Sequence, residues 1–226
     1  MTHPTGSSIT LQAADGHRLE AWRAAPAIAP RAGVVVLQEI FGLNAHTRHE
    51  AERYAGDGFL AVAPAMFDRV KPGLLVDYSD VQGGLAAANA IGEAQLVADL
   101  QAAVDAAAAA GPVVVVGWCW GGALAYLAAC RCRGVAAAVC YYGSRIAQFC
   151  ERMVPAVPVL YHFGEKDGSL PPEAIAKIRA AHPAGVHHIY PGAGHAFTNS
   201  DRASYDAAAA TLAHARTLEF IGASVG

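Results

Sequence analysis

Short apolar runs alternate along the chain with longer segments in which apolar and polar residues mix. Apolar runs of four to eight residues that are rich in valine and bounded by Gly or Pro are typical of buried strands. We expect such strands at residues 33–38, 59–63, 113–116, 135–141, 158–163 and 186–190. Ahead of them, residues 8–12 and 18–22 flank Asp15-Gly16. This dipeptide between two strand-like runs predicts an N-terminal β-hairpin.

Most of the sequence between the expected strands is predicted to be helical. Helices are expected at residues 46–55, 85–110, 122–131, 172–182 and 201–221. Residues 66–84 are expected to form a loop that contains a short helix. Asn44 is placed to cap the first of them. Strands that alternate with helices predict right-handed βαβ units and a mostly parallel sheet with helices on both faces. We therefore expect one α/β domain over residues 1–226.

Composition and charge narrow the class of protein. The chain has 226 residues, of which 54% are hydrophobic and 15% charged, so a folded globular protein is expected. A net charge of −3 without a cluster of Lys and Arg argues against nucleic acid as a partner. There is no apolar run of 18 residues and no secretion-signal pattern at the start, so no membrane partner and a cytoplasmic location are expected. The five cysteines are then free thiols.

The strongest chemical signal is Gly117-x-Cys119-x-Gly121, followed by Gly122, between a valine-rich strand and a helix. This is the strand–turn–helix arrangement of a nucleophile elbow, with Cys in place of Ser. The turn is tight, so small neighbours are needed, and the sulfur lies at a helix N-terminus that favours a thiolate. The motif alone fits an inert cysteine equally well, and its position directly after a buried strand favours catalysis.

Two further residues follow in the order expected for such a hydrolase. Asp167 comes after the strand expected at 158–163, and His195 comes after the strand at 186–190. Each has an ordinary alternative, since Asp is common in turns and His is common in loops. The order nucleophile, acid, histidine, with each residue after a strand, favours a catalytic triad.

Motifs spread from about residue 8 to residue 221 resemble those of the dienelactone hydrolase (carboxymethylenebutenolidase) family. They are Gln38-Glu39-Ile40-Phe41-Gly42, Gly117-Trp118-Cys119-Trp120-Gly121-Gly122, Tyr141-Tyr142-Gly143, Gly164-x-x-Asp167 and Gly194-His195-x-Phe197. The resemblance implies an α/β-hydrolase fold that cleaves an ester or enol-lactone bond with a Cys-His-Asp triad. It also implies that no metal or organic cofactor is needed.

The resemblance assigns a role to each matched residue. Cys119 is the nucleophile, His195 the general base and acid, and Asp167 the residue that orients the imidazole. Glu39 takes part in activating the cysteine. The backbone N–H groups of Ile40 and Trp120 correspond to the oxyanion hole. Aromatic side chains beside the motifs are candidates for a substrate pocket, with core packing as the alternative: Phe41, Trp118, Tyr142 and Phe197.

The resemblance implies the catalytic class of the family but not its dienelactone substrate. Dienelactone-cleaving members hold the substrate carboxylate with two arginines, and Asn199 stands at the position of one of them. Residues 77–89, where the other would lie, contain no arginine. Arg69, Lys71 and Arg202 are nearby in sequence, but the sequence does not place them. A thioesterase or other carboxylesterase, and a non-catalytic small-molecule-binding module, therefore stay open, as does a monomer or weak homodimer.

The remaining cysteines and histidines fit structural roles better than metal binding. The other cysteines, expected to be inert, are Cys130, Cys132, Cys140 and Cys150. His46 and His49 lack the spacing of a zinc protease, and we expect them on a solvated helix face. His187 and His188 are neighbours in a strand, so their side chains should point to opposite faces.

Overall fold

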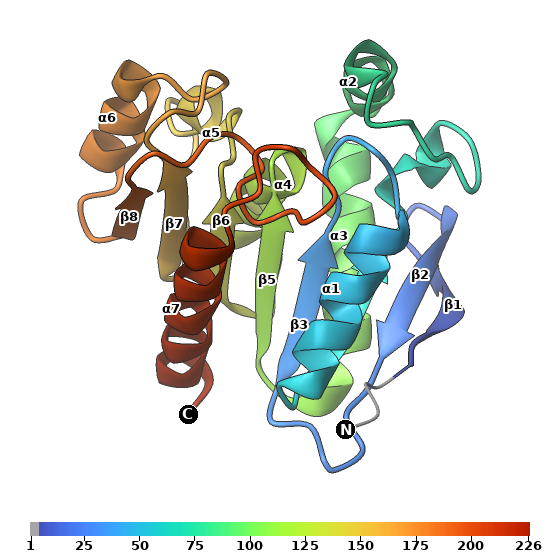
Figure 1. The fold of residues 1–226 in the computed structure, drawn as a ribbon. Helices are drawn as coiled ribbons and strands as arrows, with labels where there is room; N and C mark the ends of the chain where they lie inside the picture. Colours follow the sequence, from blue (N-terminus) through green and yellow to red (C-terminus); the bar gives the residue numbers. More distant parts are fainter. Residues whose placement is uncertain (1–4) are drawn as a thin grey trace.

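The computed structural model describes residues 5–226, which form an eight-stranded sheet flanked by helices (Figure 1). The strands follow the order β1-β2-β4-β3-β5-β6-β7-β8 across the sheet. Only the β1–β2 and β2–β4 pairings are antiparallel, and the others are parallel. The strands are β1 Ser7–Gln12, β2 Arg18–Ala24, β3 Gly33–Leu37, β4 Leu60–Pro64, β5 Val113–Trp118, β6 Val135–Tyr141, β7 Val159–Gly164 and β8 Val186–Tyr190. The predicted N-terminal hairpin and mostly parallel sheet are confirmed.

Helices cover both faces of the sheet, which is why the central strands consist almost entirely of buried residues. Helices α1 and α7 lie on one face, and α3 and α4 pack together on the other (Figure 1). The helices are α1 Ala45–Gly56, α2 Val81–Asn89, α3 Glu93–Ala107, α4 Trp120–Arg131, α5 Ile146–Phe149, α6 Pro172–Ala181 and α7 Ala207–Val225, with 3₁₀ turns η1 Met66–Arg69 and η2 Ala108–Ala110.

The alanine-rich segment 85–110, predicted as one helix, is two helices and a 3₁₀ turn. Helix α2 begins earlier, at Val81, because the Asp80 carboxylate accepts a hydrogen bond from the Gly83 N–H (2.8 Å). Gly92 then breaks the helix, since its backbone is extended (φ −71°, ψ 153°) and its N–H donates to the Gln95 side chain (3.0 Å).

Two other expectations need correction. The closing helix begins at Ala207 rather than at 201, because Asp206 caps it by accepting from the Ala209 N–H (2.9 Å). His46 lies on the buried side of α1, not on a solvated face, whereas His49 is exposed. The buried side of α1 also carries Thr47 and Glu50, so the polar residue types did not identify the solvated side of this helix.

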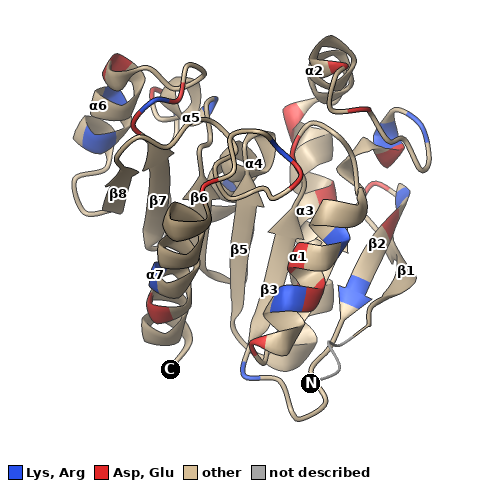
Figure 2. Cartoon of the chain, viewed as in Figure 1, with Lys and Arg blue, Asp and Glu red and all other residues tan. Residues whose placement is uncertain are grey.

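Charged side chains lie mainly on the helices and loops and on β2 (Figure 2). The parallel strands β3, β4, β5, β6 and β7 contain no Lys, Arg, Asp or Glu. None of the helices in the described part of the chain is both long and apolar enough to cross a membrane.

Candidate active site

Cys119 occupies the sharp turn between β5 and α4, and its backbone has a positive φ of 54°. This conformation is strained for a residue with a side chain, so the surrounding structure must hold it. The Cys119 N–H donates to the Tyr141 carbonyl on the neighbouring strand (2.9 Å). A Cβ on Gly117 would lie 2.0 Å from the Gly121 carbonyl oxygen, and a Cβ on Gly121 would lie 2.4 Å from that of Leu37. The two glycines thus allow the helix to start directly against the sheet.

Asp167 and His195 meet at the carboxyl ends of β7 and β8. The His195 Nδ1–H donates to Asp167 Oδ2 at 2.8 Å, and the Asp167 side chain is fully buried. Asp167 Oδ1 accepts from the Ser169 N–H (2.8 Å), so both carboxylate oxygens are fixed. The Tyr142 ring packs edge-on against the imidazole at 5.0 Å between centroids. The imidazole is therefore held in one orientation, with Nε2 left for another partner.

That partner is Cys119. Burial alone lowers the pKa of His195, but hydrogen bonds to Asp167 and Cys119 outweigh it and raise this pKa from 6.5 to about 10. The imidazole is therefore protonated at neutral pH, between a buried carboxylate and a sulfur atom. The structure brings together the three side chains that the sequence selected.

Glu39 follows β3 and is buried at the same end of the sheet. Its Oε2 accepts a hydrogen bond from the Asn199 Nδ2 (2.8 Å), and Asn199 is fully buried. No other hydrogen bond to this carboxylate is found among residues 5–226. Burial first, and then the nearby charge of Glu39, raise the pKa of Tyr142 well above its ordinary value, and Cys119 adds to this effect. Tyr142 thus lies close to both Glu39 and Cys119.

Tyr78 is a residue of the site that the sequence did not indicate. The Asn199 Nδ2 also donates to the Tyr78 hydroxyl (3.4 Å), which accepts from Asn44 (3.2 Å) and donates to Asp201 (3.4 Å). Tyr78 lies in an irregular segment before α2, so no periodic pattern could have placed it.

The two N–H groups expected to form an oxyanion hole are free to bind a ligand. The Ile40 N–H donates no hydrogen bond to another residue of the described part of the chain. Trp120 is the first residue of α4, where a backbone N–H has no carbonyl partner within the helix. The Trp120 ring itself packs on Phe67 (5.1 Å).

The aromatic candidates for the pocket lie around these groups but are largely buried. The Trp118 ring stacks on Tyr141 at 5.2 Å, and Phe197 packs between Tyr142 (5.6 Å) and Tyr190 (4.9 Å). Phe41 lies edge-on against Tyr78 (4.7 Å). Their contribution to a substrate pocket stays a prediction.

The structure also places two of the cations that the sequence left unplaced, Arg69 and Arg202. Arg69 is committed elsewhere, to Asp99 (2.7 and 2.8 Å) and Asp15 (2.7 Å). The Arg202 guanidinium lies over the rings of Phe41 (5.3 Å) and Tyr78 (5.1 Å). It forms no ion pair with any residue that the structure describes. Arg202 is therefore a free cation beside the Glu39 side of the site.

The other cysteines differ from Cys119 in their surroundings. Burial raises the pKa of Cys130 to about 11 and that of Cys132 to about 12, and it also raises the pKa of Cys140 and Cys150. These thiols stay protonated at neutral pH, as expected for inert cysteines.

Comparison with known proteins agrees with this geometry. The model of the dienelactone hydrolase family matches residues 19–225. Carboxymethylenebutenolidase of Pseudomonas putida is 36% identical over 225 residues, which cover 94% of both chains. Carboxymethylenebutenolidase 1 of Cupriavidus pinatubonensis is 32% identical over 225 residues, covering 94% of this chain and 95% of the relative. A crystal structure from Klebsiella pneumoniae, provisionally assigned as a dienelactone hydrolase, superposes with a TM-score of 0.84 at 30% identity, covering 95% and 96% of the two chains. This chain belongs to the dienelactone hydrolase family.

Proposed function

We propose that this protein hydrolyses ester or lactone bonds through a thioester formed on Cys119. The observation that carries the proposal is the line of Asp167, His195 and Cys119, in which contacts at both ends raise the pKa of the imidazole to about 10. An imidazolium next to a sulfur is the charge arrangement that activates a cysteine nucleophile.

The first half of the reaction transfers the acyl group to sulfur. The Cys119 thiolate attacks the carbonyl carbon, and the carbonyl oxygen takes the negative charge. The N–H groups of Ile40 and Trp120 bind this oxyanion. The C–O bond to the leaving group then breaks, and the His195 imidazolium donates its proton to the departing oxygen. A thioester and a neutral imidazole remain.

The second half releases the acid. The neutral His195 imidazole takes a proton from water, and the hydroxide attacks the thioester carbonyl. The C–S bond breaks, which restores the thiolate beside an imidazolium. Asp167 keeps the Nδ1–H in place throughout, so that Nε2 always faces the reacting atoms.

Arg202 indicates a substrate that carries an anionic group. A guanidinium without an ion-pair partner, held on two aromatic rings, is well suited to bind a carboxylate. Arg202 would then supply the cation that Asn199 cannot, from three residues further along the chain.

The experiment is a turnover panel of an activated aryl ester, an enol lactone with a carboxylate and the same lactone without one. We expect hydrolysis by the wild type, none by Cys119→Ala, and wild-type rates for Cys132→Ala as a matched cysteine control. Turnover by Cys119→Ala would reject the mechanism. Preference for the lactone without a carboxylate would reject the role of Arg202 but leave the mechanism intact.

A further inference from the structure

Strand β8 forms an open edge of the sheet (Figure 1), because its one neighbour in the described part of the chain is β7. Such edges are usually protected by charged residues or proline, but the sequence of β8 contains neither. Val186 and Ile189 are 42% and 43% exposed. Burial lowers the pKa of His187 and of His188, so the strand carries no charge at neutral pH. The edge is therefore free to pair with another uncharged strand.

The peptide groups of β8 alternate between β7 and the open edge. The Tyr190 carbonyl faces β7, where it accepts a hydrogen bond from the Glu165 N–H (3.0 Å). Because the direction alternates along a strand, the peptide groups of His187 and Ile189 face outward. These two residues lie symmetrically about His188. When two β8 strands pair antiparallel about His188, His187 lies opposite Ile189 of the second copy, and each such pair exchanges two backbone hydrogen bonds.

A groove of about 250 Å³ lies between this edge and α6. Its apolar lining comes from Pro172, Ile175 and Ala176 of α6 and Ile189 of β8, and its two charged residues are Glu165 and Arg179. Neither charged side chain forms an ion pair with another residue in the range 5–226. The Glu165 Oε2 accepts a hydrogen bond from the Gly192 N–H (2.8 Å), which holds this carboxylate at the groove. The groove thus offers one charge of each sign without an ionic partner.

The two charges lie at opposite ends of the groove. Glu165 directly follows the carboxyl end of β7. Helix α6 runs back along the strands towards the start of β8, and Arg179 lies seven residues after Pro172, roughly 10 Å along this helix. A two-fold axis through a pair of β8 strands reverses this order. Arg179 of each copy then meets Glu165 of the other copy.

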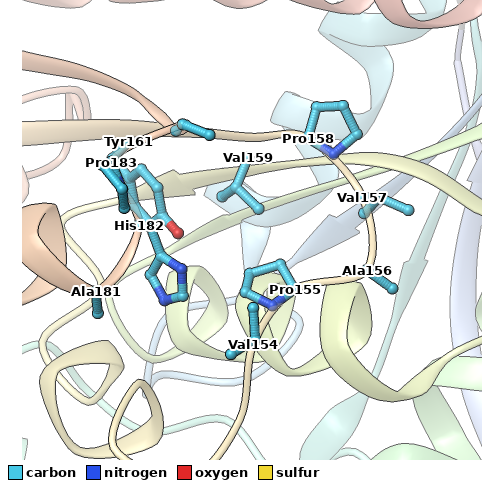
Figure 3. A pocket seen from close by; sticks show the side chains of 12 residues that line it. Val154, Pro155, Ala156, Val157, Pro158, Val159, Tyr161, Ala181, His182 and Pro183 are labelled. Carbon is cyan, nitrogen blue, oxygen red and sulfur yellow. The ribbon is translucent and has the colours of Figure 1, made fainter.

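The larger hollow of the molecule lacks this feature. It has a volume of about 510 Å³ and is lined by residues 154–159, 161 and 181–185, mostly proline, valine and alanine (Figure 3). None of its lining residues is Asp, Glu, Lys or Arg. Charge complementarity therefore selects a partner at the β8 groove and not at this hollow.

We propose that β8 and the groove beside it form the interface of a homodimer of this protein. The two β8 strands pair antiparallel about His188, the apolar groove residues of the two copies pack together, and Glu165–Arg179 ion pairs close both ends. A second copy is the partner because the same patch supplies both members of each pair, as a two-fold contact requires. The interface contains no residue of the triad and does not depend on the reaction proposed for Cys119.

Sedimentation velocity of the full-length protein tests the dimer over a dilution series down from about 200 μM, since a small interface associates weakly. We expect the mass to rise from that of one chain to that of two. Amide hydrogen exchange of residues 186–190 should slow as the dimer forms. Ile189→Lys places a charge at the edge and should raise Kd by about 10-fold or more. Ile28→Lys is the control, because Ile28 is also exposed (75%) but lies after β2, near the other edge of the sheet.

Arg179→Glu and Glu165→Arg form a complementary pair of variants. Each variant alone brings like charges together at both ends of the interface and should raise Kd by about 10-fold or more. An equimolar mixture restores opposite charges at both ends and should dimerise as the wild type does. Thermal unfolding verifies that the variants are folded, since Glu165→Arg loses the hydrogen bond to Gly192.

Three results would overturn the proposal: a wild type that stays monomeric at the highest concentration, a dimer that Ile189→Lys leaves unchanged, or a mixture of the charge variants that associates no better than each variant alone. The Ile189→Lys and hydrogen-exchange results stand even where Glu165→Arg does not fold. Ester hydrolysis per chain by Ile189→Lys should equal that of the wild type. An inactive wild type would contradict the proposed function without affecting the dimer.

Discussion

The His195 imidazole has the most strongly perturbed pKa among the three residues of the triad. Its pKa of about 10 depends on two partners from distant parts of the chain, Asp167 and Cys119. Folding therefore makes the His195 imidazole bind its proton more tightly than it does in the unfolded chain, so stability must depend on pH.

The stability that His195 contributes should be fully present below pH 6.5 and lost as the pH rises to about 10, because the folded state binds the proton more tightly. The free energy of unfolding should fall across this window by at most roughly 1.4 kcal/mol per pH unit. Urea unfolding of the wild type and His195→Gln at several pH values measures it. His49→Gln, at an exposed position, is the control. Equal slopes in the wild type and His195→Gln would contradict the account.

Asn199 is expected to position Glu39, because its amide is the group that holds this buried carboxylate. Asn199→Ala should lower kcat/KM by about 10-fold or more, the value of a hydrogen bond to a charged group. Asn199→Asp places a second carboxylate 2.8 Å from that of Glu39. The loss of kcat/KM in this variant should therefore become larger as the pH rises and both carboxylates ionise. Steady-state rates against pH distinguish the two variants. Wild-type profiles in both would show that Asn199 does not act through Glu39.

Sequence reasoning found the residues that lie in motifs and missed those that reach the site from irregular segments. Cys119, Asp167 and His195 each follow a strand, so the pattern of strands located them. Tyr78 lies in a segment without periodicity, and its contacts are with residues more than 30 positions away. Arg202 was noted, but only the fold places it over Phe41 and Tyr78.

Among the elements, the turn between β5 and α4 leaves the least space for added side-chain atoms. Gly117→Ala would place a Cβ 2.0 Å from a backbone oxygen, where no side chain can move aside. We expect a loss of roughly 3 kcal/mol in stability, with loss of activity. Gly168→Ala is the matched control, since a Cβ there meets nothing within 4 Å. Thermal unfolding and turnover measure both, and an active, stable Gly117→Ala would refute the close packing.

A buried polar cluster attaches α7 to the sheet. The Thr217 hydroxyl lies 2.6 Å from the Tyr141 hydroxyl and 3.0 Å from His162 Nε2, and His162 Nδ1 lies 2.8 Å from the Tyr190 hydroxyl. Burial lowers the pKa of His162 well below its ordinary value, so this ring is neutral. The cluster supplies hydrogen bonds without burying a charge.

Removing the Thr217 hydroxyl should leave the buried His162 Nε2 without a partner, whereas the Tyr141 hydroxyl keeps its hydrogen bond to the Ala213 carbonyl (3.3 Å). Thr217→Val keeps the shape, so the expected loss of roughly 1–3 kcal/mol comes from the unpaired His162 Nε2. Thr211→Val on the same helix is the control, because that hydroxyl is exposed and bonds only to the Ala207 carbonyl. Chemical denaturation measures the difference. Equal stability of the two variants would show that α7 is held by its apolar contacts alone.

Element boundaries show where local patterns stop being sufficient. The buried strands were predictable because short valine-rich runs bounded by Gly and Pro strongly favour the β conformation. The break at Gly92 was not predictable, because alanine-rich sequence on both sides favours a continuous helix. The four-residue helix α5 is too short for any periodicity to reveal.

At the scale of the whole molecule, the site is assembled from the carboxyl ends of four parallel strands. Glu39 follows β3, Cys119 follows β5, and Asp167 and His195 follow β7 and β8. Active sites of open α/β sheets gather at this edge, where adjacent strands deliver side chains to one place. The loop segments that carry Tyr78 and Arg202 then close one side.

Arg202 should set the preference for anionic substrates. Arg202→Gln is expected to lower kcat/KM for a carboxylate-bearing lactone by about 10-fold, the value of a charge-assisted hydrogen bond, and to leave the neutral lactone unchanged. Arg145→Gln, which changes an arginine that instead bonds Asn89, is the matched control. Equal losses on the two lactones would contradict this role.

If the acyl group passes through sulfur at Cys119, mass spectrometry can detect the acyl-enzyme. The protein is mixed with an activated ester, quenched in acid within the first turnover, and digested. We expect the added acyl mass on the peptide that contains Cys119, and we expect hydroxylamine to remove it. The adduct should accumulate in His195→Gln, because water is no longer activated in that variant. Hydrolysis at wild-type rates with no adduct on Cys119 in either protein, or an adduct on another residue, would contradict this mechanism.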